Sequence, residues 1–215
     1  MPDTLKGRHV LITAGPTREP IDPVRFISNH SSGQQGYAIA QACAHLGARV
    51  TLVAGPTALP DPMGLDTVHV ETARDMLAAV ETALPADVFI AVAAVADWRP
   101  ADPADQKLKL DKAEFTALKL VENPDILKTI SGLENDRPGL VIGFAAETHD
   151  VEALAIAKRQ RKGCDWIVAN DVSGDVMGGA ENAVILVTGD GAEHWDRAPK
   201  HAVAAQLAER IARAL

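Results

Sequence analysis

The sequence predicts an α/β fold of three layers, doubly wound around a mainly parallel sheet. Short apolar runs alternate with amphipathic stretches of helical period along most of the 215 residues. Repeated strand–helix–strand units place parallel strands side by side, with right-handed crossovers and helices on both faces. A Gly189-Asp190-Gly191 turn between two further β-like runs predicts a hairpin near the C-terminus. We therefore expect one domain spanning residues 1–215.

Each strand is predicted from a short run rich in Val, Ile, Leu and Ala. Arg8–Thr13 and Asp87–Ala93 are apolar enough to be strands buried in the sheet. The other predicted strands are Ala48–Ala54, Thr67–Val70, Gly139–Ala145, Asp165–Ala169, and the hairpin strands Ala183–Thr188 and Ala192–Asp196.

Helices are predicted from apolar spacing and from residues that start or stop a helix. Gly36–Leu46 stops at Gly47, and Thr72–Leu84 begins with Thr72 as a possible N-cap and Asp75 in its first turn. A third helix, Asn123–Ile130, is expected to have Asn123 as its N-cap and Pro124 at its first position. The remaining helices are Asp150–Lys162 and about His201–Leu215, which completes a Rossmann-like order of elements.

Residues of about 101–121 break this order and are expected to form an inserted basic flap. Lys107–Val121 alternates polar and apolar residues, which indicates an antiparallel excursion or ribbon. The lysines in it are Lys107, Lys109, Lys112 and Lys119. They form either a solvated face or a source of positive charge beside a triphosphate.

Bulk composition excludes some classes of function. The net charge is −8, from 29 acidic and 21 basic residues, which argues against a general nucleic-acid binder. No apolar run approaches the roughly 20 residues of a membrane span, and the N-terminus has no signal-peptide core, so we expect a cytoplasmic protein without membrane contact. Cys43 and Cys164 form no Cys-x-x-Cys pair and are expected to be reduced, packed thiols.

The first loop after a predicted strand, residues 14–33, is much longer than an ordinary connection of about 2–6 residues. Ser31-Ser32-Gly33 and Gly36 would let backbone amides at a helix N-terminus approach an anion. Arg18, Arg25 and Asn29 add hydrogen-bond donors. The alternative is a solvated loop that caps the helix. No Gly-Lys-Ser/Thr occurs, so this is not a Walker loop.

The remaining loops at strand ends also suggest a ligand site. In Ala93–Pro100, small residues leave room for a flat ligand, and Asp97 either accepts hydrogen bonds from ribose hydroxyls or an exocyclic amine, or is a turn residue. Gly143–Thr148 and Ala169–Asp171 follow two more strands, and no spacing in them demands a metal. Ligands of such sheets bind beyond the carboxyl ends of the strands.

Five motifs, in order, resemble the bacterial form of the phosphopantothenate–cysteine ligase family, from about Gly7 to the C-terminus. They are ITAGPTREPIDPVRFISNHSSG (Ile12–Gly33), AAVADWRP (Ala93–Pro100), NPDIL (Asn123–Leu127), GFAAET (Gly143–Thr148) and AND (Ala169–Asp171). The resemblance implies that 4′-phosphopantothenate attacks CTP to give an acyl-cytidylate and pyrophosphate. L-cysteine then displaces CMP. It also implies Mg²⁺ with the triphosphate, a homodimer, and a flavin-dependent phosphopantothenoylcysteine decarboxylase fused to the domain or associated with it.

The resemblance also assigns roles to individual residues. Asn29 corresponds to an asparagine that binds the activated intermediate, Arg25 in the same loop is expected to hold a phosphate, and Lys107 is the first lysine of a Lys-x-Lys-Lys motif. These three are the expected catalytic residues. Substrate contacts are expected from Asn29, Arg25 and Ala94. The expected nucleotide-binding residues are Gly15, Ser31, Ser32, Gly33, Ala94, Asp97, Phe144 and Lys107.

Two positions depart from the family pattern. The motif reads Lys107-Leu-Lys109-Leu110, so its last lysine is missing, and Lys112 is a candidate replacement. Gln34 stands where a lysine is often found. Three alternatives remain from the sequence: an ATP-dependent form of the ligase, an NAD(P)-dependent oxidoreductase, and a catalytically silent binding module. The oxidoreductase is disfavoured because no acidic residue follows Val53 to bind a ribose.

Overall fold

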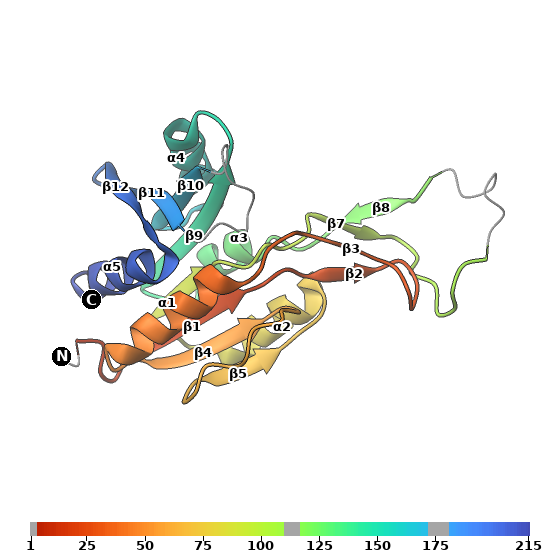
Figure 1. Ribbon diagram of the computed structural model, residues 1–215, viewed down its shortest axis with the longest axis horizontal. Helices are drawn as coiled ribbons and strands as arrows, with labels where there is room; N and C mark the ends of the chain where they lie inside the picture. Colours follow the sequence, from red (N-terminus) through yellow and green to blue (C-terminus); the bar gives the residue numbers. More distant parts are fainter. Residues whose placement is uncertain (1–3, 110–116, 172–180) are drawn as a thin grey trace.

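The computed structural model describes residues 4–109, 117–171 and 181–215. Among these residues, eight strands form the central sheet: β1 (His9–Ala14), β4 (Arg49–Ala54), β5 (Asp66–His69), β6 (Val88–Ala91), β9 (Leu140–Glu147), β10 (Trp166–Asp171), β11 (Glu181–Val187) and β12 (Ala192–Pro199). Their order is β12-β11-β10-β9-β6-β1-β4-β5 (Figure 1). The strands from β10 to β5 are parallel, and the predicted hairpin, β11–β12, extends the sheet antiparallel at one edge.

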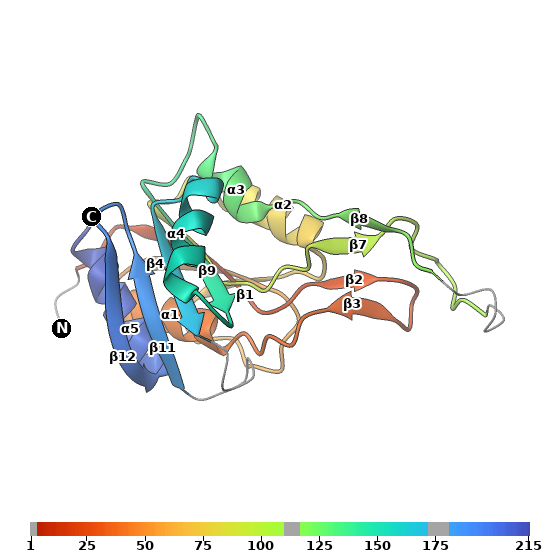
Figure 2. The same cartoon turned by 90° about the horizontal axis from the view of Figure 1, so that it is seen from above.

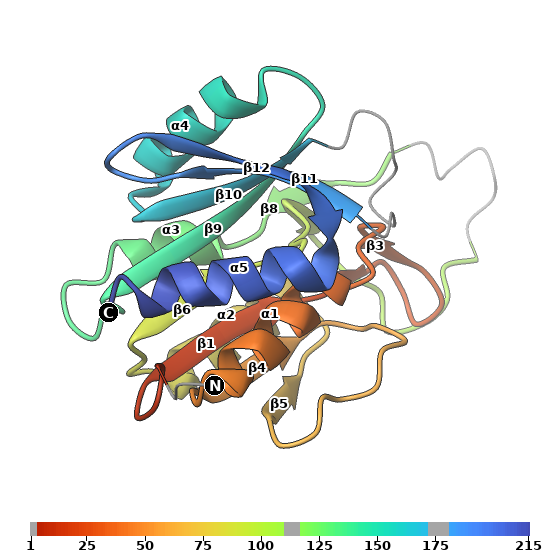
Figure 3. The ribbon, with the colours of Figure 1, turned by 60° about the vertical axis from the view of Figure 1, so that its left-hand side comes forward.

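Helices pack on both faces of the sheet, which confirms the three-layer prediction (Figure 3). Helices α1 (Gln34–His45) and α5 (Lys200–Ala212) share one apolar core with the sheet. Helices α2 (Ala73–Ala83), α3 (Ile126–Ser131) and α4 (Val151–Lys162) share the other. Strand β1 contributes to both cores, because Val10 and Ile12 face α1 and α5 while Leu11 faces the opposite layer.

Most predicted elements are confirmed to within a few residues. The start of α2 is a capping box: the Thr72 hydroxyl accepts from the Asp75 amide at 3.2 Å, and the Asp75 carboxylate accepts from the Thr72 amide at 3.0 Å.

The predicted start of the third helix is wrong. The N-cap of α3 is Asp125, whose carboxylate accepts from the Lys128 amide at 3.0 Å. Asn123 lies outside the helix because its side chain is used elsewhere: its amide donates to the Ala96 carbonyl at 2.8 Å and accepts from Arg99 at 3.2 Å. Asn and Asp are both favoured at N-caps and in turns, so residue type alone does not show that the helix begins after Asp125.

Two short antiparallel ribbons extend beyond the carboxyl ends of the parallel strands (Figures 1 and 2). One pairs β2 (Arg18–Pro20) with β3 (Phe26–Ser28), and the other pairs β7 (Trp98–Pro100) with β8 (Leu120–Glu122). Strands β2 and β7 contact each other, and the Ala104 amide donates to the Ile21 carbonyl at 2.9 Å. We call these two ribbons and their described turns, residues 18–28 and 98–109 with 117–122, the arm.

The arm only partly matches the prediction. The antiparallel excursion is confirmed at its base by β7 and β8, whereas residues 110–116, with Lys112, lie outside the described residues. The β2–β3 ribbon was missed, because strands of three residues are too short to show an alternating pattern.

Gly36 sets how closely α1 packs on β1. A Cβ added at Gly36 would lie 2.5 Å from the Ala14 Cβ and 3.2 Å from its Cα, so the obstacle is a rigid strand rather than a flexible side chain. This close contact brings the start of α1 to the carboxyl end of β1.

We predict that Gly36→Ala destabilises the protein. Overpacking typically costs about 1–3 kcal/mol, and Ala regains up to about 1 kcal/mol of helix propensity, so a net loss of about 1–2 kcal/mol in the free energy of unfolding is expected. Urea denaturation measures it. Gly139→Ala is the matched control, since its nearest neighbour would be 3.5 Å away. Equal stabilities for both variants would show that α1 can shift without cost.

Candidate active site

A cavity of about 450 Å³ lies at the carboxyl ends of the parallel strands, as the fold predicts for a ligand site. Its walls come from the long loop and the start of α1, the loop after β6, the ends of β9 and β10, and the start of β11 and α5. Seven residues expected from the sequence line it: Asn29, Ser31, Ser32, Gly33, Ala94, Asp97 and Phe144.

Backbone and side-chain hydrogen bonds at Ala94 join the two principal loops. The Ala94 amide donates to the Gly15 carbonyl at 2.9 Å. The Ala94 carbonyl accepts from the Asn29 side-chain amide at 2.9 Å and from the Thr17 amide at 3.3 Å. Asn29 is otherwise exposed to the cavity, so the hydrogen bond holds its side chain against the loop after β6.

The start of α1 presents backbone donors to the cavity. Gly33 is the N-cap, with φ of 78° that only glycine adopts readily, and no side chain caps the helix. The first turn contains no acidic residue, so its positive dipole end is not neutralised locally. With Ser31 and Ser32 beside it, this end of the cavity suits an anion.

The loop after β6 separates this cavity from a second one of about 390 Å³, lined partly by β8 and α3. Asp97 is exposed and lines both cavities. The loop is held from both sides, because the Ala96 amide donates to the Thr17 hydroxyl at 3.0 Å and the Asn123 amide donates to the Asp97 carbonyl at 2.8 Å. The Asp97 carboxylate is therefore carried on a well-braced loop.

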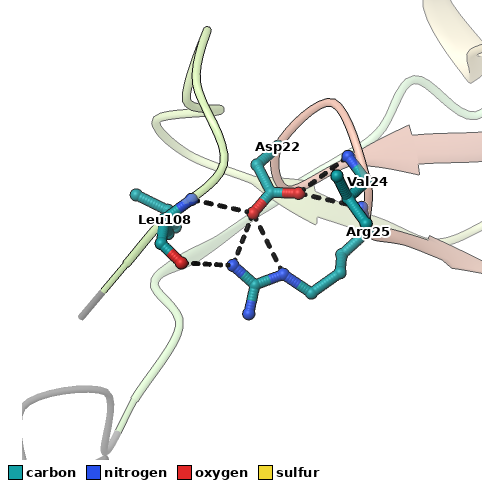
Figure 4. A network of polar contacts seen from close by, with 4 residues as sticks. All are labelled: Asp22, Val24, Arg25 and Leu108. Carbon is teal, nitrogen blue, oxygen red and sulfur yellow. Dashed lines mark hydrogen bonds and ion pairs between the residues drawn. The ribbon is translucent and has the colours of Figure 1, made fainter. Parts of the chain in front are cut away.

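Three expected site residues do not line the cavity. Gly15 lies next to it, with φ of 77°, and its carbonyl accepts from Ala94. Arg25 and Lys107 lie on the arm, where the Arg25 guanidinium contacts Asp22 and the carbonyl of Leu108 (Figure 4). Within one chain the structure thus joins Asn29 to the other loops but does not bring Arg25 or Lys107 to them.

The structure adds basic and amide residues that the sequence reasoning missed. Lys158 of α4, Asn170 of β10, Arg197 of β12 and Lys200 of α5 also line the cavity. A signal existed only for Lys158, which lies one helical turn after the buried Ala155 and so on the same face. The others come from elements whose sequences show ordinary strand or helix patterns.

Lys158 brings a cation toward the cavity. Its ammonium donates to the Phe144 carbonyl at 2.8 Å. Burial lowers the pKa of this lysine, and the neighbouring Lys162 lowers it further. An anionic ligand would stabilise the charged form of Lys158 and offset the free-energy cost of its burial.

The Asn170 side chain also lines the cavity. Its oxygen is buried without a hydrogen-bond partner, which leaves an acceptor unsatisfied.

The part of the chain that the structure describes contains neither a clustered metal site nor a membrane-spanning helix. Within residues 4–109, 117–171 and 181–215, no group of three or more His, Cys, Asp or Glu side chains is arranged to hold a metal ion. No helix in that part of the chain is long and apolar enough to cross a membrane.

Comparison with known proteins identifies the family. The family profile described as DNA/pantothenate metabolism flavoprotein C-terminal domain matches residues 5–215. The chain is 45% identical over 214 residues to the coenzyme A biosynthesis bifunctional protein CoaBC of Vibrio vulnificus, covering 98% of this chain and 53% of the relative. It is 50% identical over 192 residues to the Escherichia coli K12 protein of that name, covering 87% and 47%. The chain thus spans about half the length of the curated relatives it matches.

A solved structure extends the comparison to the fold. The crystal structure of the C-terminal domain of a coenzyme A biosynthesis bifunctional protein CoaBC matches with a TM-score of 0.82 and 42% identity, covering 98% of this chain and 97% of that one. Sequence profile, relatives and structure agree with the resemblance carried by the five motifs. The chain belongs to the DNA/pantothenate metabolism flavoprotein C-terminal domain family.

Proposed function

We propose that the chain is the ligase that joins 4′-phosphopantothenate to L-cysteine with CTP, in coenzyme A biosynthesis. Its similarity to bifunctional proteins of that pathway supports the pathway. The observation that carries the proposal is the cavity in which Asn29, the uncapped start of α1 and Lys158 meet, because it combines amide donors with positive charge. That combination suits a reaction between a carboxylate and a triphosphate.

The chemistry proceeds in two displacements. A carboxylate has no good leaving group, so one carboxylate oxygen attacks the α-phosphorus of CTP and pyrophosphate leaves. The cysteine amine then attacks the acyl carbon of the acyl-cytidylate, CMP leaves, and the nitrogen loses a proton to give the amide. The protein mainly positions the reactants and stabilises developing charge. Mg²⁺ is proposed to enter with the triphosphate, as it usually does.

We assign roles within the cavity by what each group offers. The backbone amides at the start of α1, with the Ser31 and Ser32 hydroxyls, bind phosphate oxygens. Asp97 accepts hydrogen bonds from the nucleotide. Contacts of the nucleotide with Gly15, Ala94 and Phe144 follow from their position at or beside the cavity.

Lys107 and a homodimer are proposed together. The arm extends away from the cavity of its own chain and exposes large apolar side chains: Val24, Phe26, Trp98 and Leu120. If a second copy of the chain covered these side chains, Lys107 of each copy would approach the cavity of the other copy. Direct binding of a phosphate by Arg25 remains a prediction that would likewise need this second copy.

The relatives are about twice as long as the chain, and each is described as bifunctional. We therefore propose that a flavin-dependent decarboxylase, fused or associated, consumes the product. The expected location is the cytoplasm, where the phosphorylated substrates are made.

We predict that CTP supports turnover, measured as pyrophosphate release, better than ATP does. The purified protein is incubated with 4′-phosphopantothenate, L-cysteine, Mg²⁺ and each nucleoside triphosphate in turn, and pyrophosphate is measured. CTP is expected to give the highest kcat/KM. An equal or higher kcat/KM with ATP would contradict the preference for CTP. Absence of turnover with every nucleotide would contradict the proposal that the chain is this ligase.

We predict that Asn29→Asp stops amide formation after activation. The new carboxylate cannot donate a hydrogen bond and repels the oxyanion that forms on the acyl carbon. Acyl-cytidylate should accumulate in the presence of cysteine, as detected by quenching and mass spectrometry. Asn182→Asp is the control, because it adds the same charge to the cavity where Asn182 donates to the Gln35 side chain at 3.0 Å; it is expected to weaken phosphate binding without accumulating the intermediate. Absence of any intermediate would place Asn29 in binding or activation instead.

We predict that Lys107→Ala slows acyl-cytidylate formation by about 10²–10³, the usual cost of one lost electrostatic contact. If Lys107 serves the partner's cavity, mixing this variant with Asn29→Asp creates dimers with one intact site. Neither variant alone completes the reaction at a normal rate, so equal mixing is expected to restore amide formation, followed as CMP released in the presence of cysteine, to about a quarter of the wild-type rate. Exchange of subunits without any gain in rate would mean that Lys107 does not act across the dimer.

A further inference from the structure

The carboxylate of Asp22 is the centre of the polar contacts at the end of the arm (Figure 4). Asp22 lies in the turn between β2 and β3, and its side chain has no solvent-exposed surface. One oxygen, Oδ1, accepts from the amides of Val24 and Arg25, each at 2.9 Å. These bonds shape the turn and orient the second oxygen toward the other ribbon.

The second oxygen joins the two ribbons through Leu108. Oδ2 accepts from Nε of Arg25 at 3.0 Å, forms an ion pair with Nη2 of the same guanidinium, and accepts from the Leu108 amide at 3.1 Å. Nη2 of Arg25 in turn donates to the Leu108 carbonyl at 3.2 Å. The backbone amide and carbonyl of Leu108 are therefore both bonded, as they would be beside a neighbouring strand.

These contacts set the position of two lysines. Lys107 and Lys109 flank Leu108 and are exposed, whereas Leu108 is half-buried. Residues 107 and 108 are 82 or more positions from the turn that holds them, so no local preference of the sequence could replace these bonds. When the backbone of Leu108 is held in place, the Cα atoms of Lys107 and Lys109 on either side of it are held as well.

We propose that Asp22 is a positioning residue, which acts with Arg25 to hold residues 107–109 so that Lys107 reaches the phosphates of the substrates. The part that concerns phosphates rests on the proposed function. The part that concerns the segment rests on geometry alone. Arg25 then contributes to activation through Lys107, in addition to any contact of its own.

The ionised form of Asp22 is the one that holds the segment. The Arg25 guanidinium and the amide donors hold the pKa of the Asp22 carboxyl well below its usual range. Because the folded-state pKa is depressed, the stabilisation is complete above the ordinary pKa and is lost only as the pH falls through the lowered value. The contact is thus present throughout the neutral range.

Trypsin cleavage after Lys107 tests the geometry without any substrate. Asp22→Asn keeps the shape of the side chain but removes its charge and one of its two acceptor oxygens, so its NH2 group must face either the Val24 and Arg25 amides or the Leu108 amide. We expect its Lys107–Leu108 bond to be cleaved about tenfold faster or more than in the wild type, because a lost charge-assisted hydrogen bond shifts local opening by about that factor. Mass spectrometry follows the fragment that ends at Lys107.

Asp165→Asn is the matched control. Asp165 also accepts from a backbone amide, that of Val141 at 2.7 Å, and from an arginine, Arg137 at 3.0 Å, but it lies in the main body rather than on the arm. Its cleavage after Lys107 should match the wild type. Unchanged cleavage in Asp22→Asn, or equal acceleration in both variants, would overturn the proposal.

A double-mutant cycle tests whether Asp22 acts through Lys107. Asp22→Asn should slow acyl-cytidylate formation by about 10²-fold, a typical effect of a misplaced catalytic group. The double variant with Lys107→Ala should be no slower than Lys107→Ala alone, to within about twofold. If the double variant were slower than Lys107→Ala by the full factor that Asp22→Asn causes alone, the proposal would be overturned. A wild-type rate for Lys107→Ala would remove the role of Lys107 from the proposed function, whereas the cleavage assay would still decide whether Asp22 holds the segment.

A second pair of variants addresses the same contact if Asp22→Asn does not fold. Leu108→Pro removes the backbone N–H whose hydrogen bond Asp22 accepts, and it also removes the leucine side chain and fixes φ; Leu108→Ala shortens the side chain but keeps the N–H. The proline variant should show the slow activation expected of Asp22→Asn, and the alanine variant should be near wild type. Equal rates for the two would contradict the proposal.

Discussion

The hydrogen bonds at the backbone of Ala94 are the contacts on which the candidate site most depends. Strands β1 and β6 are adjacent and parallel, so the loops that follow them leave the sheet at the same edge. Ala94 joins these loops by donating to Gly15 and accepting from Asn29 and Thr17. These contacts use only the backbone of Ala94, whose side chain is partly exposed and lines the cavity. The backbone thus joins the loops while the small side chain leaves room for a ligand.

The arm extends from the same edge of the sheet, but a different kind of interaction holds it together. The apolar cores account for the sheet and its helices, but the two ribbons have little core of their own and are joined by polar contacts. The carboxylate of Asp22 accepts hydrogen bonds from its own turn and from the other ribbon, and it forms an ion pair with Arg25 at the centre of the contacts in Figure 4. Charge-assisted bonds of this kind are stronger than neutral ones and demand a defined geometry. These contacts fix the position of residues 107–109, which lie away from the cavity. The positive groups within the cavity of the same chain include Lys158 and the start of α1.

The sequence predicted the sheet, its helices and most of one side of the cavity, because apolar period and strand-end position are local signals. Asn29, Gly33 and Asp97 could be placed together since their loops leave neighbouring strands. What it missed depends on long-range contacts. Asn123 was taken as a helix cap because nothing local shows that its amide bonds to Ala96. The contact of Arg25 with Leu108 could not be predicted either, because Leu108 is 83 residues away and only the fold brings the two together.

The proposed reaction activates a carboxylate as an acyl-cytidylate in the cavity before an amine attacks. The most direct test uses 4′-phosphopantothenate labelled with ¹⁸O in its carboxylate, together with CTP, Mg²⁺ and L-cysteine, and measures where the label goes. Attack by a carboxylate oxygen on the α-phosphorus moves one labelled oxygen into CMP when the amide forms. The account predicts CMP heavier by one ¹⁸O for each amide bond made. Unlabelled CMP, or label in orthophosphate, would show that activation takes another route and would contradict it.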